Sequence, residues 1–504
     1  MRRWHPVAFR PAWAPVLALV LLLALPLSGW AAASEAGMTY LEPYPRGEVM
    51  LLEPEIGWPV RIVGARVRRA VLELQGTGVK RSTSLTYDAE KGAYVYHPAQ
   101  PLSPGRYEAR IRLELAGPYR PVERRWEFVV HRDAVSASEL MDAAAAVSVT
   151  ALAAANDYRQ RLGLAPFEVH PSLMWSAQRH AAYLAANGQL SHFQEREKKE
   201  FTGTTVEERA RRGGYFYGVA EDISQQPEPD PVLAIDGLFD APYHRIPFLL
   251  PQARDWGYGQ QDVYHVLNVG VWPMAGVHIV HAPGDGETGV PLQWDGHEVP
   301  DPLRLHEGAA YPVGYPIVIG AFGDDVQQVQ LVSARLTDAD GRTLPLYLNT
   351  PANDEELQRE LILIPVHPLK PGTTYRVTVD WVLVDTRGRN QRHHTAWTFQ
   401  TERRIGEGKQ LLHRSPAAVD EVAADSAASP TDDREDELTH VTFWSDAPLL
   451  QSWIGSFSLP VAISYDRLSA VAQWFNGRFG IRWDDDDRRL RWRVAGYELE
   501  WLFD

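Results

Sequence analysis

The stretch "NDYRQRLGLAPFEVHPSLMWSAQRHAAYLAANGQLSH", residues 156–192, decides the fold of the middle of the chain. Its apolar residues from Leu173 to Leu184 recur at helical spacing and would share one face of a helix. Pro171 stands near the first turn of this helix and Gly188 just past its end, where these residue types are common. The stretch therefore predicts a helix that ends at a polar turn.

The flanking sequence extends this helix into a layered domain. An Ala-rich run that starts after Ser138 and stops at Gly163 predicts an earlier helix. After Pro251, "WGYGQ" and "VYHVLNVGV" read as strands. Helices followed by an antiparallel pair of strands indicate an α+β layered domain over residues 138–282.

The whole-chain composition limits the class of protein. A length of 504 residues favours three or four domains rather than one core. The formal net charge of −15 disfavours nucleic acid and anionic lipid as partners, because both need a basic surface. The chain has no cysteine, which excludes disulfides, thiol chemistry and cysteine-ligated metal sites.

Residues 1–33 read as a leader rather than as part of the fold. A basic start is followed by an apolar run from Val16 to Leu27 and by "WAAAS", which predicts a secretory signal peptide cleaved after Ala33. The apolar run is short for a membrane span, and a retained anchor is the alternative. The sequence thus predicts a secreted or envelope-associated protein with no stable membrane span after cleavage.

Two regions, 38–133 and 283–402, read as all-β immunoglobulin-like sandwiches. Their strand-like segments alternate and are separated by turn residues. They also repeat each other: "HPAQPLSPGRYEARIRLEL" before "RRWEFVV" matches "IPVHPLKPGTTYRVTVDWVLV" before "TAWTFQT". In each, a Pro-Gly turn precedes a tyrosine strand, and a later Trp-x-Phe strand would place both rings on one face.

The end of the chain reads as a linker and a small domain. Residues 405–438 are acidic, rich in Ala, Ser and Pro, and nearly free of large apolar residues, which predicts disorder. Residues 439–504 read as a small α+β domain with a helix in "SYDRLSAVAQWFNGRFGI" and a hairpin in "IRWDDDDRRLRWRV". This domain faintly resembles stalk-like domains related to the copper amine oxidase N-terminal domain. Asp484 to Asp487 read as a solvated turn, with calcium binding as the less favoured alternative.

The central region carries a set of motifs in a specific order. The opening stretch contributes Asn156, Tyr158, Arg159, Gly163, Leu164, Ala165, Pro166, Leu173, Ala177, His180, Ala181, Leu190, Ser191 and His192. It is followed by Ala220-Glu221-Asp222-Ile223 and by "AIDGLFDAPYHRIPFLLPQARDWGYG". With these residues the region resembles the CAP superfamily of cysteine-rich secretory and pathogenesis-related proteins, in its bacterial SCP-like extracellular form. That family usually has Gly-Glu-Asn-Ile at the second motif and, in bacteria, a W-x-x-S-P-x-H-R-x-x-I-L segment at the third. The resemblance implies an α-β-α sandwich.

The same resemblance implies a cleft lined by His192, Glu221 and His244, with Asp222 and Arg245 beside them. Two imidazoles and a carboxylate could hold a divalent metal ion such as zinc with one open position. In a catalytic reading, Glu221 would be the general base.

The central region also departs from the family pattern. Leu238, Ala241 and Asp222 replace the usual Trp, Ser and Asn. A second cleft glutamate has no clear equivalent, although Asp240 lies nearby in sequence. These departures favour binding over catalysis.

His180 reads as a packing residue of the helix.

Three functions remain open on the sequence. The favoured one is a secreted cell-envelope protein whose CAP cleft binds a wall polymer, lipid or peptide. A structural surface or spore-coat protein with a vestigial cleft comes second. A metal-dependent hydrolase acting on protein or cell wall comes third, because no Gly-x-Ser-x-Gly, P-loop or His-Glu-x-x-His pattern is present.

Overall fold

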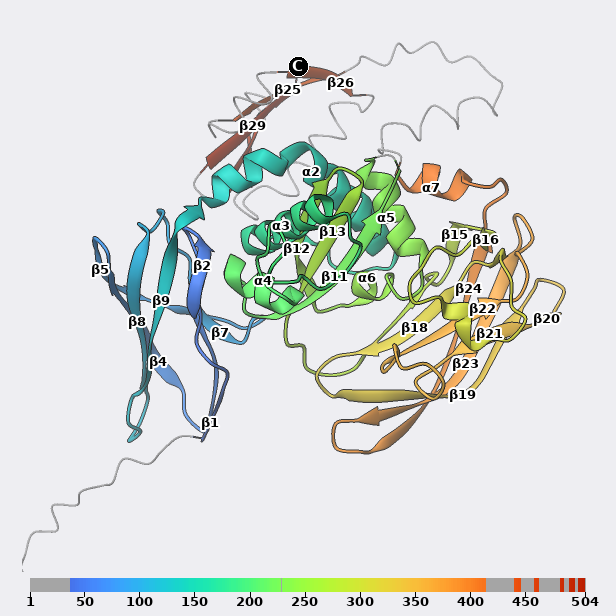
Figure 1. The fold of residues 1–504 in the computed structure, drawn as a ribbon, viewed down its shortest axis with the longest axis horizontal. Helices are drawn as coiled ribbons and strands as arrows, with labels where there is room; N and C mark the ends of the chain where they lie inside the picture. Colours follow the sequence, from blue (N-terminus) through green and yellow to red (C-terminus); the bar gives the residue numbers. More distant parts are fainter. Residues whose placement is uncertain are drawn as a thin grey trace, which may run out of the picture. The chain divides into compact units, whose positions relative to one another are not determined.

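A computed structural model describes residues 37–227 and 229–413 and five strands near the C-terminus (Figure 1). The chain divides into two compact units, Met1–Ser415 and Pro416–Asp504. The predicted signal peptide lies outside the described residues. Among the described helices, none is long and apolar enough to cross a membrane.

The N-terminal β domain has two antiparallel-rich sheets, with strand orders β1-β3-β7-β6 and β2-β9-β8-β4-β5. Alternate residues of β8 are buried from Tyr107 to Leu115, so one face of this sheet supplies the sandwich core. The strands are β1 (Gly37–Tyr40), β2 (Gly47–Leu51), β3 (Ile56–Val63), β4 (Val67–Gly76), β5 (Val79–Ser84), β6 (Thr86–Asp88), β7 (Ala93–Tyr96), β8 (Gly105–Leu115) and β9 (Val122–Val135).

The second β domain is also built from two main sheets, ordered β14-β18-β22-β21 and β15-β24-β23-β19-β20, with a short β16-β17 pair. Its elements are β14 (His278–Ala282), β15 (Glu287–Val290), β16 (Gln293–Trp294), η1 (Pro302–Leu305), β17 (Val313–Gly314), β18 (Ile317–Phe322), β19 (Val326–Thr337), β20 (Thr343–Leu344), β21 (Leu346–Asn349), β22 (Glu360–Pro365), β23 (Thr374–Asp385) and β24 (Asn390–Thr401).

The predicted repeat is confirmed in the packing of both β domains. Tyr107 lies opposite Phe128 in the register of β8 and β9, and their rings stack with centroids 5.4 Å apart. Tyr375 lies opposite Phe399 in β23 and β24, with stacked rings 5.7 Å apart. The same tyrosine–phenylalanine pair therefore occupies the same place in two separate cores.

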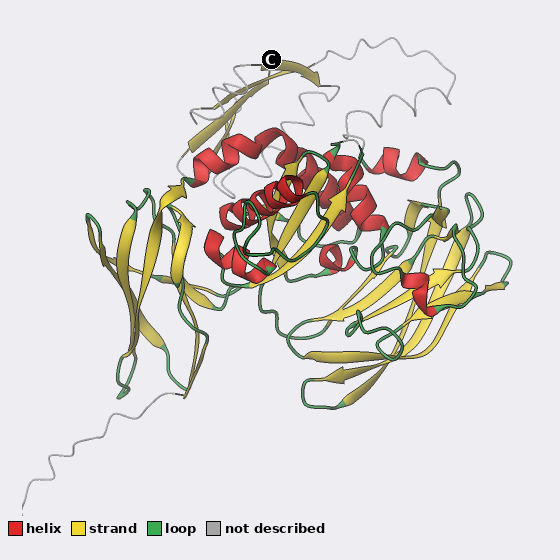
Figure 2. Ribbon diagram, in the orientation of Figure 1, coloured by secondary structure: helices red, strands yellow, loops and turns green. Residues whose placement is uncertain are grey.

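Between these domains lies a sheet ordered β10-β12-β13-β11, with helices on both faces (Figure 2). The predicted helix is α3, which has Pro171 at its start and the left-handed Gly188 as its C-cap. The elements are α2 (Ala137–Arg161), β10 (Glu168–Val169), α3 (Pro171–Asn187), α4 (Val206–Gly213), β11 (Gly218–Gln225), α5 (Pro231–Asp240), α6 (Ile246–Leu249), β12 (Ala253–Gln261) and β13 (Tyr264–Val271).

Two glycines let α3 lie directly on β12. A Cβ at Gly257 would come within 2.1 Å of the backbone of Leu173, and one at Gly259 within 2.3 Å of the backbone of Ala177. Only residues without a side chain allow helix and strand backbones to approach this closely. The contact fixes the first half of α3 against β12.

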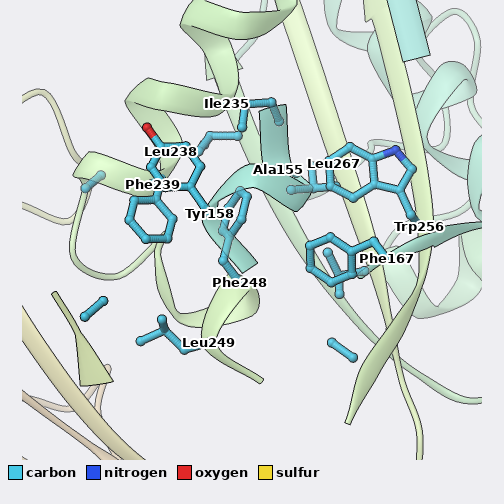
Figure 3. Packing of buried hydrophobic residues seen from close by; sticks show 14 of the residues in the cluster. Ala155, Tyr158, Phe167, Ile235, Leu238, Phe239, Phe248, Leu249, Trp256 and Leu267 are labelled. Atoms are coloured by element: carbon cyan, nitrogen blue, oxygen red, sulfur yellow. The ribbon is translucent and has the colours of Figure 1, made fainter. Parts of the chain in front are cut away.

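The opposite face of the sheet carries the main hydrophobic core (Figure 3). Trp256 of β12 and Leu267 of β13 pack there with Tyr158 of α2 and with Phe239 and Phe248 from α5 and α6. The rings of Tyr158 and Phe239 are stacked with centroids 3.8 Å apart. This core also contains Trp294, Val318, Phe322 and Ile362 of the second β domain, so the two domains share one apolar interior.

The predicted linker is wrong for its first residues. Residues 407–412 form helix α7 (Glu407–Leu412), which is held against the central domain. Lys409 forms an ion pair with Asp240, and the His413 ring contacts Asp157 at 3.0 Å and Asp236 at 2.8 Å. These tertiary contacts order a segment whose composition resembles a linker. Residues 414–438 lie outside the described residues.

The C-terminal unit contains one antiparallel sheet ordered β26-β25-β29-β28-β27. The predicted hairpin is confirmed, because Ile481 pairs with Trp492 and Asp484 with Arg489. Its strands are β25 (Thr439–Ser445), β26 (Phe457–Val461), β27 (Ile481–Asp484), β28 (Arg489–Val494) and β29 (Tyr497–Phe503). The predicted helix before the hairpin and most of the acidic turn lie outside the described residues.

Candidate functional site

The first half of the site is built around Glu221 on β11, an edge strand of the central sheet. Arg209 of α4 donates to both carboxylate oxygens of Glu221, each at 2.7 Å. The Asn268 side chain, directly opposite in β13, donates to Oε2 at 3.0 Å. The His192 Nδ1 lies 3.1 Å from Oε1. Glu221 is thus a buried, fully hydrogen-bonded carboxylate.

The electrostatics of Glu221 keep it ionised. Burial opposes its charge, but the hydrogen bond with His192 and the positive charge of Arg209 outweigh burial and lower the pKa of Glu221 to about 2. A carboxylate with so low a pKa, held by a buried guanidinium, is a poor acceptor for a substrate proton at neutral pH. The prediction of Glu221 as general base is therefore not supported by its surroundings.

The turn after α3 places His192 at the surface. His180, in the middle of α3, is buried as predicted, and its Nε2 lies 2.9 Å from the Ser191 carbonyl oxygen. Its Nδ1 lies 2.9 Å from the Gln194 amide nitrogen. Arg209 adds a bond to the His192 carbonyl oxygen at 3.1 Å. The His192 backbone is therefore fixed from both sides, while its side chain remains 49% exposed.

The second half of the site lies on the other face of β11. Successive side chains of a strand point to opposite faces, so Asp222 points away from Glu221. Asp222 is buried, its Oδ2 has no hydrogen-bond partner among the described residues, and burial raises its pKa to about 7. His244, in the turn between α5 and α6, and His192 are both close enough to Asp222 to oppose that shift.

His244 is held by a residue of the second β domain. Glu298, in the segment between β16 and η1, accepts through Oε1 from the backbone N–H groups of Tyr243 and His244, at 2.8 and 2.9 Å. The same oxygen lies 2.8 Å from His244 Nδ1. Burial disfavours the charged ring, but the Glu298 bond and the charges of Asp222 and Glu298 outweigh burial and raise the pKa of His244.

The structure therefore resolves the predicted trio into two acid–histidine pairs, His192 with Glu221 and His244 with Glu298. Among the described residues, no three His, Asp or Glu side chains are arranged to hold a metal ion. Glu221 also has Arg209 on both oxygens, and a bound cation would face this buried guanidinium. The set of His192, Glu221 and His244 consequently does not fit a shared metal ion.

Two further predicted residues lie elsewhere. Arg245 is fully buried and donates to the carbonyl oxygens of Phe239, Asp240 and Pro316, so its guanidinium is not available to a ligand. The prediction of Arg245 as a cleft residue is corrected accordingly. The Asp240 carboxylate accepts from Tyr315 at 3.0 Å and pairs with Lys409, so it does not supply the second cleft acid.

The sequence reasoning missed Arg209 and Glu298. Arg209 lies in "ERARRGG", where several basic residues on a short helix gave no reason to choose one. Glu298 belongs to a different domain and follows no motif, so only the tertiary fold brings it to His244. His180 was correctly predicted as buried, but its contact with the Glu221 carboxylate at 3.7 Å was not foreseen.

Two cavities of about 490 Å³ each lie in the central domain away from these pairs. One is lined by Ser148, Arg179 and Gln260, and the other by Asn156 and Pro166, among other residues. Neither includes a residue of the two acid–histidine pairs. The term acid–histidine site is used below for His192, Glu221, Asp222, His244 and Glu298.

Residues 152–266 match the model of the CAP domain, described as the cysteine-rich secretory protein family. No curated protein matched the sequence. An extracellular protein containing a SCP domain from Bacillus anthracis str. Ames is 13% identical, covers 54% of this chain and 100% of that chain, and gives a TM-score of 0.24. An outer surface protein from Borrelia burgdorferi is 18% identical over 27% of this chain and 96% of that chain, with a TM-score of 0.21.

A third similar structure, of an engineered protein, is 18% identical over 20% of this chain, with a TM-score of 0.15, and the match spans 21% of that protein. Identities and TM-scores this low assign no function to the chain. The family model and the layered fold do agree on the central region. Residues 152–266 are a CAP domain of the cysteine-rich secretory protein family, carried between two β domains of a multidomain chain.

Proposed function

We propose that this chain is a secreted cell-envelope protein whose CAP domain binds an envelope ligand at the acid–histidine site. The observation that carries the proposal is the half-exposed His192 ring, whose backbone and partner are both held rigidly by buried groups. A rigid, partly exposed imidazole above an ionised carboxylate is suited to hydrogen bonding with a ligand.

The surroundings of His192 add apolar contact area. Leu190 and Phe193 are large apolar side chains exposed in the same turn, at 51% and 61%. Exposed apolar residues beside fixed polar groups are typical of binding surfaces. A wall polymer, a lipid or a peptide could each supply both kinds of contact, and the experiment below separates them.

The proposal is tested with purified full chain against three separate probes: peptidoglycan, lipid vesicles and a peptide library. Saturable binding to one probe is expected, and His192→Ala with His244→Ala should weaken it at least tenfold. His394→Ala is the matched control, since His394 is an exposed histidine paired with Asp380 in the second β domain. The absence of saturable binding to all three probes would refute the proposal.

The alternative of a structural surface protein predicts a different result. In that case the double histidine variant and the wild-type chain would restore an envelope phenotype equally well in a deletion strain. A metal-dependent hydrolase is not favoured. Both carboxylate oxygens of Glu221 accept hydrogen bonds from Arg209, and the predicted ligands do not form one cluster among the residues that the structure describes.

A further inference from the structure

The contact between Glu298 and His244 crosses a domain boundary at the acid–histidine site. His244 belongs to the CAP domain, whereas Glu298 lies in the second β domain, 54 positions further along the chain. The Glu298 side chain is completely buried, and its Oε1 accepts three hydrogen bonds from Tyr243 and His244. Such a bond set fixes both the backbone and the ring of His244.

The geometry determines which ring nitrogen of His244 remains available. Because Nδ1 faces the carboxylate oxygen at 2.8 Å, it must carry a proton to make this bond. In the neutral ring Nε2 is then the unprotonated nitrogen. Among the described residues, Nε2 has no hydrogen-bond partner, and the side chain is 17% exposed. Nε2 is therefore the atom that His244 can offer to a ligand.

We propose that Glu298 is a positioning residue of the CAP site, supplied by the neighbouring β domain to hold His244 in the Nδ1–H form with Nε2 free. The CAP domain and the second β domain thus form one functional unit, and the site is incomplete in the CAP domain alone. This inference deepens the proposed binding function and rests on it for its biological meaning, but it can be tested without any ligand.

A purely structural role for Glu298 is the competing explanation. Glu298 also bonds two backbone amides, and its loss could simply loosen the domain contact. The two explanations differ in the tautomer of His244. Without a carboxylate at Nδ1, the ring should return to the Nε2–H form that free histidine prefers, whereas a structural role requires no particular tautomer.

The test is nitrogen NMR of the full chain labelled with ¹⁵N-histidine, at a pH where the ring is neutral. The His244 signals are assigned by their loss in His244→Gln. The wild-type ring should show a protonated Nδ1 and an unprotonated Nε2. Glu298→Ala should reverse this pattern, and Glu298→Gln should preserve it, because the amide oxygen can still accept from Nδ1.

Asp380→Asn is the matched control, since Asp380 contacts Nδ1 of His394 at 2.7 Å in the same β domain. It should change the His394 signals and leave those of His244 unaltered. A wild-type His244 in the Nε2–H form, or an unchanged pattern in a folded Glu298→Ala chain, would overturn the inference. If Glu298→Ala fails to fold, the wild-type measurement still tests the inference, because a His244 ring in the Nε2–H form would overturn it.

The NMR test of Glu298 and the binding test of the proposed function can fail independently. If His244 is in the Nδ1–H form but the chain binds none of the envelope probes, the proposed function is refuted and the role of Glu298 stands. If a ligand is found, Glu298→Ala should weaken its binding about as much as His244→Ala, and the double variant should cause no further loss.

Discussion

At the scale of single residues, the contact between Arg209 and Glu221 is a buried ion pair with two hydrogen bonds. Both side chains are buried, and the guanidinium contacts both carboxylate oxygens. Removing one partner of a buried ion pair leaves an uncompensated charge in a poorly solvated environment. A single substitution in this pair should therefore strongly destabilise the CAP domain.

Arg209→Met should lower the free energy of unfolding by about 3–5 kcal/mol, because it leaves the Glu221 carboxylate buried without its cation. Urea denaturation monitored by tryptophan fluorescence measures the change. Arg211→Met, on the exposed side of the same helix, should have little effect. Adding Glu221→Gln to Arg209→Met should restore part of the lost free energy of unfolding. A double variant less stable than Arg209→Met alone would contradict the explanation.

The low pKa of Glu221 makes a prediction about pH. The pKa in the folded chain is about 2, below the ordinary value of 4.5, so ionised Glu221 stabilises the fold fully above 4.5 and loses this effect as the pH falls towards 2. The stability difference between wild type and Glu221→Gln should shrink across that range. Parallel stability curves for the two chains between these pH values would contradict the assignment.

The sequence could indicate the residues of the site better than their arrangement. His192, Glu221 and His244 could be recognised because the family motifs that contain them occur in a fixed order along the chain. Their division into two pairs, His192 with Glu221 and His244 with Glu298, follows from tertiary contacts that chain order does not show. Glu298 could not be predicted, because no local pattern links a residue of one domain to a histidine of another.

At the scale of elements, α3 was predictable and α7 was not. Pro171, Gly188 and the apolar spacing between them are local signals of a helix, and α3 spans the residues that they indicate. In contrast, α7 is a short helix that is held in place by Lys409 and His413 contacting the CAP domain and by Leu412 packing against the main hydrophobic core. Tertiary contacts of this kind leave no trace in local composition.

The close contact of α3 with β12 predicts the effect of a single methyl group. Gly259→Ala should lower the free energy of unfolding by about 1–3 kcal/mol or more, because the new Cβ would overlap the backbone of Ala177. Gly237→Ala in α5 is the control, since its Cβ would meet only the end of the Gln226 side chain at 3.3 Å. Thermal unfolding of both variants measures the difference, and equal losses would contradict the packing argument.

The contacts of His413 make the attachment of α7 depend on pH. Burial disfavours the charged ring, but its bonds to Asp236 and Asp157 outweigh burial and raise its pKa above the ordinary 6.5. The attachment should thus be fully stabilised below pH 6.5 and weaken as the pH rises through the raised pKa. Over that pH range, the amide hydrogen exchange of residues 407–413 should accelerate more than the pH dependence of the intrinsic exchange rate predicts. His413→Gln should abolish this additional acceleration.

At the scale of the whole molecule, the CAP domain and the second β domain share a hydrophobic core. Ile362 of β22 lies in this shared core, whereas its neighbour Leu363 faces the separate core of the β sandwich. Both side chains are fully buried. Two adjacent residues of one strand therefore belong to two different hydrophobic cores.

Ile362→Ala should lower stability by about 2–5 kcal/mol and speed up amide exchange in β12 and β13 of the CAP domain, as well as in β22. Leu363→Ala should cost a similar amount but act mainly within the second β domain. Exchange measured by mass spectrometry distinguishes the two patterns. Identical amide exchange patterns in the two variants would contradict the assignment of Ile362 and Leu363 to separate cores.

The shared core and the Glu298 contact also bear on how such chains can be recombined during evolution. A rearrangement that joined the CAP domain to an unrelated downstream domain would remove Val318, Phe322 and Ile362 from the shared core and, at the same moment, the partner of His244. Selection would act against both losses together. We therefore expect these two domains to be inherited as a pair, with substitutions at Glu298 accompanied by changes at His244.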